Sequence, residues 1–154
     1  MATNGQTLNT KLLSFASEAC WSTGRIDELA NRVGTEVDDQ TSDFNIQIGR
    51  ALVAMRDTDY DLFSDIIAQL RCSTVKSLTS ANASSLQACH DVFLKLHVIY
   101  EVGALSGHLP SSAWPQGFGA VMNAMDKRLG VLGSYISDKQ YILAIRRAVM
   151  RLAV

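Results

Sequence analysis

The sequence predicts an all-α protein of about seven helices. Apolar residues recur every three or four positions along almost the whole chain, and no segment shows the alternation typical of a β-strand. The 154 residues are 47% hydrophobic and 19% charged, as expected for a folded chain with a sizeable core. Because the helices follow one another in pairs, we expect antiparallel pairs stacked as an α-solenoid, not a closed bundle. No motif recurs at a constant period, so the succession of helices alone carries this expectation.

The first two helices are predicted to form a hairpin around Gly24, which suits the left-handed conformation that follows a helix. Thr7, Asn9 or Thr10 can cap the first helix. Its expected inner face consists of Leu8, Leu12, Phe15, Ala16 and Ala19. Trp21 lies at its end and is expected to pack the hairpin.

The second helix carries Asp27 and Glu28 in its first turn, where negative charge is favourable. Gly34 is expected to end it, and residues 34–41 are polar enough to form a loop. Its expected apolar side consists of Ile26, Leu29, Ala30 and Val33.

Ser42 is predicted to cap the third helix, and the segment 57–59 to end it and cap the fourth. The third helix presents Phe44, Ile48, Ala51, Leu52 and Met55 on one side. The fourth presents Phe63, Ile66, Ile67 and Leu70, with the stripe running on toward Val75 and Leu78. A turn is expected at 80–83.

The fifth helix is expected from Ser84 or Ser85 to Gly103. Its predicted inner stripe is Leu86, Cys89, Phe93, Leu96 and Tyr100. Residues 103–117 form the longest irregular segment, a loop that contains Trp114. This tryptophan either anchors the loop on the core or is exposed for a neighbouring protein, and we favour anchoring.

The sixth helix is predicted over 117–133, and the seventh from Ser137 or Asp138 to the C-terminus. The sixth is expected to bury Phe118, Val121, Met122, Met125, Leu129 and Leu132. The seventh is expected to bury Ile142, Ile145, Val149 and Leu152.

Net charge and hydropathy argue against nucleic acid and a membrane as partners. The net charge of −1 argues against bulk electrostatic binding of nucleic acid, and no apolar run is long enough to cross a membrane. Residues 1–77 contain seven Lys or Arg and eleven Asp or Glu, whereas residues 78–154 contain seven and four. Such an asymmetry either orients neighbours in an assembly or reflects ordinary solvated faces. The three widely spaced cysteines favour a reducing compartment.

No catalytic, metal or cofactor site is expected. Potential zinc ligands lack the close pairing of structural zinc motifs; they are Cys72, Cys89, His90 and His97. Cys89 is better explained as a small core residue and His97 as a half-buried structural histidine. The acidic run 57–61 lacks the glycine and final glutamate of a calcium loop, and no recognisable catalytic triad is present.

The last helix carries three basic residues, Arg146, Arg147 and Arg151, the last two one turn apart. Cations near a helix C-terminus are stabilised by the helix dipole, which is sufficient to explain them. The alternative is a patch that docks a partner protein.

Four segments together resemble the FAT domain of ATR-type kinases, in the phosphatidylinositol 3-kinase-related family. They are residues 20–29 (CWSTGRIDEL), 49–52 (GRAL), 94–101 (LKLHVIYE) and 142–149 (ILAIRRAV). The last is the most specific, because it is similar to the family's ILALRRALL-like signature. Together the segments span about residues 15–154, in the family's order.

The resemblance implies tetratricopeptide-like and HEAT-like helical repeats over residues 10–154, with residues 1–9 a flexible start. It implies a non-catalytic scaffold that supports a serine/threonine kinase of the nuclear DNA-damage checkpoint. The implied partners are the rest of the parent kinase, its partner subunit and a second copy. The kinase's own glycine-rich loop and Asp-Phe-Gly segment are absent from this chain. The alternative function is a stand-alone helical adaptor that binds a partner helix or peptide.

Overall fold

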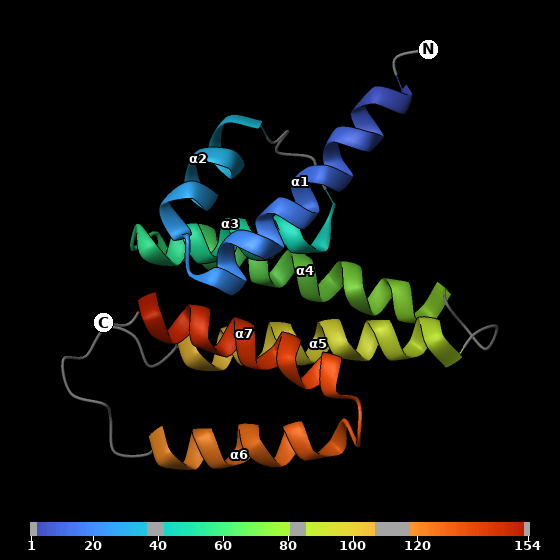
Figure 1. Ribbon diagram of the computed structural model, residues 1–154. Helices are drawn as coiled ribbons and strands as arrows, with labels where there is room; N and C mark the ends of the chain where they lie inside the picture. Colours follow the sequence, from blue (N-terminus) through green and yellow to red (C-terminus); the bar gives the residue numbers. More distant parts are fainter. Residues whose placement is uncertain (1–2, 37–41, 81–85, 107–117, 153–154) are drawn as a thin grey trace. The chain divides into compact units, whose positions relative to one another are not determined.

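The computed structural model describes residues 3–36, 42–80, 86–106 and 118–152, which form seven helices and no strand (Figure 1). The helices are α1 (Thr3–Thr23), α2 (Ile26–Glu36), α3 (Phe44–Arg56), α4 (Tyr60–Ser80), α5 (Leu86–Ser106), α6 (Phe118–Val131) and α7 (Ile136–Leu152). The predicted all-α class is confirmed, and the helices are consistent with a helical solenoid. The chain divides into two compact units, Met1–Leu70 and Arg71–Val154, with the boundary inside α4.

The first unit is built on mutual packing of α1, α2 and α3, each of which contacts the other two. The predicted hairpin between α1 and α2 is confirmed. The buried apolar residues of these three helices are Leu13, Cys20, Trp21, Leu29, Val33, Ile46, Ile48, Ala51, Leu52, Ala54 and Met55. The inner face predicted for α3 is thus largely confirmed, with Phe44 only half-buried.

The inner face predicted for α1 is wrong. Leu12 and Phe15 are 61% and 69% exposed. The buried residues are instead Leu13, Ser17, Cys20 and Trp21. Neighbouring helical positions differ by about 100° around the axis, so a stripe shifted by one residue faces another direction. The helix also begins at Thr3, before the caps predicted at Thr7, Asn9 or Thr10.

Two predicted helix ends in this unit are also wrong. Gly34 does not stop α2, which continues to Glu36, because glycine weakens a helix by only about 1 kcal/mol. Asp43, not Ser42, caps α3: its Oδ1 accepts hydrogen bonds from the backbone N–H of Asn45 (3.0 Å) and Ile46 (3.1 Å). The predicted loop at 34–41 lies partly outside the described residues.

Gly49 of α3 lies against residues of both α1 and α2. A Cβ atom at Gly49 would lie 3.1 Å from Leu29 Cδ1, 3.6 Å from Val33 Cγ2 and 3.7 Å from Ser17 Cβ. Leu29 is fully buried and cannot move away freely. Glycine at this position therefore lets three helices share one contact point.

We expect Gly49→Ala to be about 1–3 kcal/mol less stable than the matched variant Gly34→Ala, by urea unfolding followed by circular dichroism. Both changes raise helix propensity by about 1 kcal/mol. Only the alanine at Gly49 meets packed atoms, whereas a Cβ at Gly34 has no atom within 4 Å. Equal stability of the two variants would contradict close packing at Gly49.

Helix α4 begins as predicted and departs from prediction further along. Asp59 Oδ1 accepts a hydrogen bond from the Leu62 backbone N–H (3.1 Å), which confirms the predicted cap. The stripe Phe63, Ile66, Ile67 and Leu70 is buried, as predicted. Its continuation is wrong, since Thr74 is buried and Val75 is 49% exposed. The turn predicted at 80–83 lies mainly outside the described residues.

The second unit is organised around the packing of α5 against α7. His90 pairs with Asp138, and further along both helices Glu101 pairs with Arg146. The two helices therefore run in the same direction, and Figure 1 shows α6 running the opposite way. The buried apolar residues of the unit are Val92, Val98, Ile99, Val102, Leu105, Met125, Ile142, Ala144, Ile145, Ala148 and Val149.

The stripe predicted for α5 is wrong. Leu86 and Phe93 are 92% and 53% exposed, and the other three predicted members are only half-buried. This helix has apolar residues on several sides, so sequence periodicity alone does not identify the side that α7 covers. The faces of α6 and α7 were predicted better: Met125, Ile142, Ile145 and Val149 are buried. The remaining predicted residues of these two helices are half-buried.

Candidate functional site

The first of the four family-like segments, residues 20–29, contains the turn between α1 and α2. Gly24 has φ of +79°, the left-handed conformation predicted for it. The backbone N–H of Arg25 donates to Cys20 O (2.8 Å) and that of Gly24 to Trp21 O (3.3 Å). This pair of bonds is a Schellman motif, which ends α1 and directs the chain back along it.

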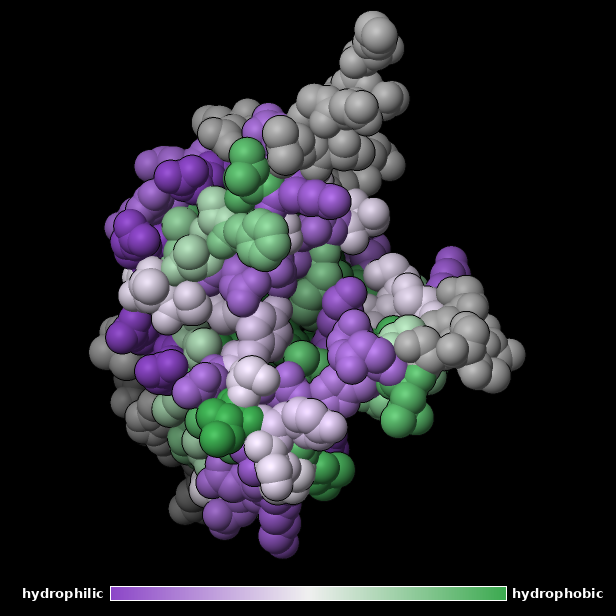
Figure 2. Space-filling view, turned by 45° about the vertical axis from the view of Figure 1, so that its right-hand side comes forward, coloured by the Kyte–Doolittle hydropathy of each residue, from purple (hydrophilic) through white to green (hydrophobic). Residues whose placement is uncertain are grey.

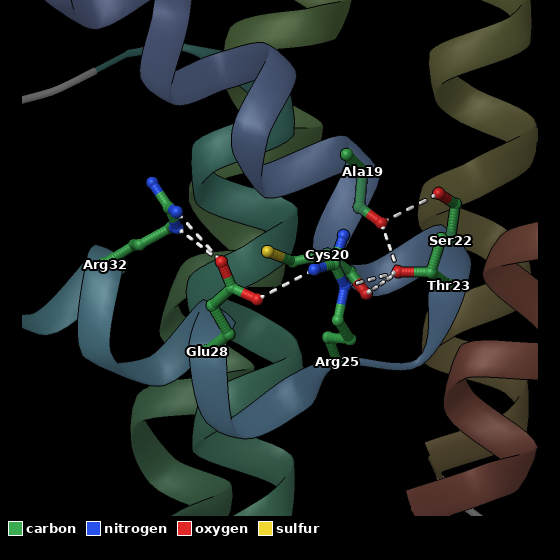
Figure 3. A network of polar contacts seen from close by, with 7 residues as sticks. All are labelled: Ala19, Cys20, Ser22, Thr23, Arg25, Glu28 and Arg32. Carbon is green, nitrogen blue, oxygen red and sulfur yellow. Dashed lines mark hydrogen bonds and ion pairs between the residues drawn. The ribbon is translucent and has the colours of Figure 1, made fainter.

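Polar side chains brace this turn, as Figure 3 shows. Thr23 Oγ1 donates to Ala19 O (2.6 Å) and accepts from Arg25 Nε (3.3 Å). Glu28 is shared by Arg25 (3.1 Å) and Arg32 (2.8 Å). The hydrogen bond from Arg32, followed by the charge of Arg25, lowers the pKa of the Glu28 carboxyl. These exposed pairs fix the local geometry and add little to stability.

The same turn holds no reactive thiol. Cys20 is 3% exposed, and burial raises the pKa of its thiol, with Glu28 adding to the effect. A thiol that stays protonated is a poor nucleophile and metal ligand. Cys20 therefore packs as a small core side chain.

An ion-pair cluster joins the third and fourth family-like segments. Arg146 donates from Nε to Glu101 Oε2 (2.8 Å) and from Nη2 to Glu101 Oε1 (2.9 Å). Its Nη1 donates to Asp126 Oδ1 on α6 (2.7 Å). The Arg146 and Glu101 side chains are 5% and 2% exposed, whereas Asp126 is 64% exposed. A single guanidinium thus links α5, α6 and α7, bidentately to α5.

Arg146 stays charged in this setting. Burial lowers its pKa, but the hydrogen bonds and charges of Glu101 and Asp126 outweigh burial and raise the pKa above its ordinary value. A buried arginine that is paired with carboxylates orients helices.

The opposite end of the α5–α7 contact carries a second polar pair. His90 Nε2 and Asp138 Oδ2 are 2.7 Å apart, and the His90 ring lies 5.3 Å from the Tyr135 ring. Further along α5, Arg128 of α6 lies over the Tyr100 ring, with Cζ 3.7 Å from its centroid. A cation over an aromatic face is weakly stabilising and holds α6 against α5.

We expect His97 to make the stability of the second unit depend on pH. Burial, then the charge of Arg128, lowers the pKa of His97 below 6.5, while Glu101 opposes this. The unfolded chain therefore binds a proton at higher pH than the folded chain. We expect the unfolding free energy to fall as pH drops through 6.5 toward the folded pKa, and this fall to be smaller in His97→Gln. Urea unfolding between pH 5 and pH 8 measures it, with the exposed Lys127→Gln as control. An identical pH dependence in His97→Gln would contradict the assignment.

The residues predicted to be structural or to bind partners differ in burial and contacts. Trp21, Ile142 and Ile145 are buried, and Leu96 is half-buried. Phe93 is mostly exposed, so it lies outside the core. Arg146 is buried in the cluster and does not form an exposed patch with Arg147 and Arg151. Arg147 is exposed and its Nε donates to Leu143 O (3.3 Å). Trp114 and most of the loop predicted at 103–117 lie outside the described residues.

The buried pair of Glu101 and Arg146 was not predicted from the sequence, although the positions of the two residues indicate it. Arg146 occupies an apolar position of the α7 stripe, one residue after Ile145 and three before Val149. On α5, Glu101 lies three residues after Val98 and one before Val102. Charges of opposite sign inside two apolar stripes indicate a buried pair, because an isolated buried charge is too costly.

Large apolar side chains remain exposed in both units. Figure 2 shows hydrophobic side chains breaking the hydrophilic surface on the face it draws. The most exposed are Leu12, Phe15, Leu86, Phe93, Val131, Tyr135 and Ile136. Exposed apolar side chains become typical of protein–protein contacts where they form a contiguous patch.

The described part of the chain shows neither a candidate metal-binding group nor a membrane-spanning helix. No three His, Cys, Asp or Glu side chains converge there as a metal-binding group. None of its helices combines the length and apolar character needed to span a membrane. What the arrangement does is hold helices in fixed mutual positions.

A model of the FAT domain matches residues 13–154. The match starts within α1 and includes all the other helices, the turn at Gly24 and the cluster around Arg146. No curated protein and no solved structure matches the chain.

Proposed function

Because the chain belongs to the FAT domain family, we propose that it is a scaffold segment of an ATR-like serine/threonine kinase of the DNA-damage checkpoint. The FAT domain is a non-catalytic helical scaffold domain of phosphatidylinositol 3-kinase-related kinases. In this proposal the segment supports the conformation of the kinase domain and contacts other protein subunits in the nucleus.

The observation that carries the proposal is the position of the residues that resemble the family: they lie at contacts between helices. Arg146, in the most specific segment, is buried against Glu101 in another such segment. Gly49, in a third, is packed against Leu29 at the end of the first. Residues that carry the resemblance therefore set helix positions, which is the work of a scaffold. The exposed apolar side chains supply surface for the neighbours that a scaffold needs.

The test uses the full-length parent protein, purified with its natural partners. We expect phosphorylation of serine or threonine peptides with ATP. We also expect Arg146→Met to lower this activity, because it loosens the scaffold, while the exposed Arg147→Met leaves it unchanged. The 154-residue chain alone should not turn over ATP.

Three outcomes would overturn the proposal. One is a coding sequence without a kinase domain. Another is ATP turnover by the 154-residue chain itself. The third is a tagged full-length protein that stays out of the nucleus after DNA damage, which would remove the checkpoint role.

A further inference from the structure

Helix α6 buries little of its surface within the second unit. Of its described residues only Met125 is buried, whereas α5 and α7 each bury six residues. The α6 backbone approaches α5 and α7 less closely than these two helices approach each other, and Figure 1 shows α6 apart from the pair. Because most helical stability in proteins comes from packing of a buried face, packing stabilises α6 only weakly.

Asp126 and Arg128 join α6 to its neighbours through contacts that water reaches. Asp126 accepts a hydrogen bond from Nη1 of Arg146 (2.7 Å), but the Asp126 side chain is 64% exposed. Arg128 lies over the Tyr100 ring, with Cζ 3.7 Å from the ring centroid, and is itself exposed. Exposed ion pairs and exposed cation–π contacts each contribute little to stability. These two contacts therefore position α6 without fastening it strongly.

Two glycines of α6 lower the stability of the helix without serving its packing. A Cβ atom at Gly119 or at Gly130 would meet no atom within 4 Å. Both residues have helical backbone, so neither a close approach nor a left-handed conformation requires glycine there. Glycine is one of the weakest helix formers. The sequence thus keeps α6 less stable than its surroundings would allow.

We propose that α6 is a releasable element, which detaches from α5 and α7 by local unfolding while those two helices stay paired. The pair retains its own buried apolar residues and the bidentate bond from Arg146 to Glu101. Release takes Met125 out of the core and frees Nη1 of Arg146 and one face of the Tyr100 ring. The second unit then has two states that differ in the exposure of these groups. The proposal concerns residues 71–154 alone and is independent of the proposed kinase scaffold role.

Amide hydrogen exchange of the full 154-residue chain, followed by NMR at increasing urea, tests the release. We expect the amides of α6 to be protected, but at least tenfold less than those of α5 and α7. Their exchange should depend only weakly on urea, because release exposes little surface, whereas exchange in α5 and α7 should rise steeply. Protection and urea dependence equal to those of α5 and α7 would overturn the proposal. Complete absence of protection in α6 would also overturn it, since a helix that is not formed cannot be released.

Matched side-chain variants test the contacts that hold α6. We expect Asp126→Asn and Arg128→Met each to speed exchange in α6 about two- to fivefold, the range of exposed ion pairs, and to leave exchange in α5 and α7 unchanged. Lys127→Met is the control, because it removes an exposed cation from the same helix, and it should have no effect. If both contact variants behave like Lys127→Met, or speed exchange equally in all three helices, the proposal is wrong.

Stabilising the helix should have the opposite effect. We expect the double variant Gly119→Ala with Gly130→Ala to slow exchange in α6 about two- to fivefold, because alanine favours the helix at positions where its Cβ meets no atom. Gly34→Ala on α2 is equally free of close contacts and should leave α6 unchanged. Unchanged or faster exchange of α6 in the double variant would contradict release by local unfolding.

Discussion

Replacement of Arg146 by methionine is expected to lower the free energy of unfolding by about 3–5 kcal/mol. Methionine fills similar space but donates no hydrogen bond, so the 2%-exposed Glu101 carboxylate would remain buried without its partner. The contact to Asp126, which helps hold α6, would be lost as well. Urea unfolding followed by circular dichroism at neutral pH measures the loss.

Two further variants separate the ion pair from general disturbance of α7. Arg147→Met changes the neighbouring, exposed arginine and should alter stability by no more than about 0.5 kcal/mol. The double variant Arg146→Met with Glu101→Leu removes both charges and should recover most of the lost stability. A loss below about 1 kcal/mol in Arg146→Met alone would show that the pair is not closed off from water.

The local features of this fold were readable from the sequence. The left-handed Gly24, the acidic first turn of α2 and the Asp59 cap each depend on residues close together in the chain. The inner faces of α3 and α7 were also largely correct, because both helices are buried over much of their surface and most of the predicted residues fall within it. The number of helices and the all-α class were predicted from the recurrence of apolar residues every three or four positions.

The wrong faces share one physical cause. Helix α1 offers Leu12 and Phe15 on one side and Leu13 and Trp21 on another, and both sides have helical spacing. Periodicity identifies an apolar stripe, but the burial of one stripe depends on which neighbour packs against it. On α5, Phe93 and Val92 present the same ambiguity, and contact with α7 decides it.

The candidate site was hidden for a related reason. Glu101 and Arg146 are 45 residues apart in sequence, and only the packing of α5 on α7 brings them together. From the sequence, Arg146 was grouped with Arg147 and Arg151, because the helix dipole is sufficient to explain cations near a helix C-terminus. Its place within the apolar stripe was the discriminating observation.

The second large expected loss of stability concerns the side of α1 that faces the core. We expect Trp21→Ala to lower the free energy of unfolding by about 3–5 kcal/mol, because Trp21 is 1% exposed and its loss leaves a large cavity in the first unit. The matched variant Phe15→Ala, on the same helix, removes an aromatic ring that is 69% exposed. It should change stability by about 0.5 kcal/mol or less.

The comparison of these two variants by urea unfolding decides which side of α1 faces the core. Each change removes one aromatic ring from the same helix, so the difference between them reports burial more than helix propensity. The stripe that the sequence favoured contains Phe15, and the stripe that α2 and α3 cover contains Trp21. A larger loss in Phe15→Ala than in Trp21→Ala would reverse the orientation of α1 and with it the packing around Gly49.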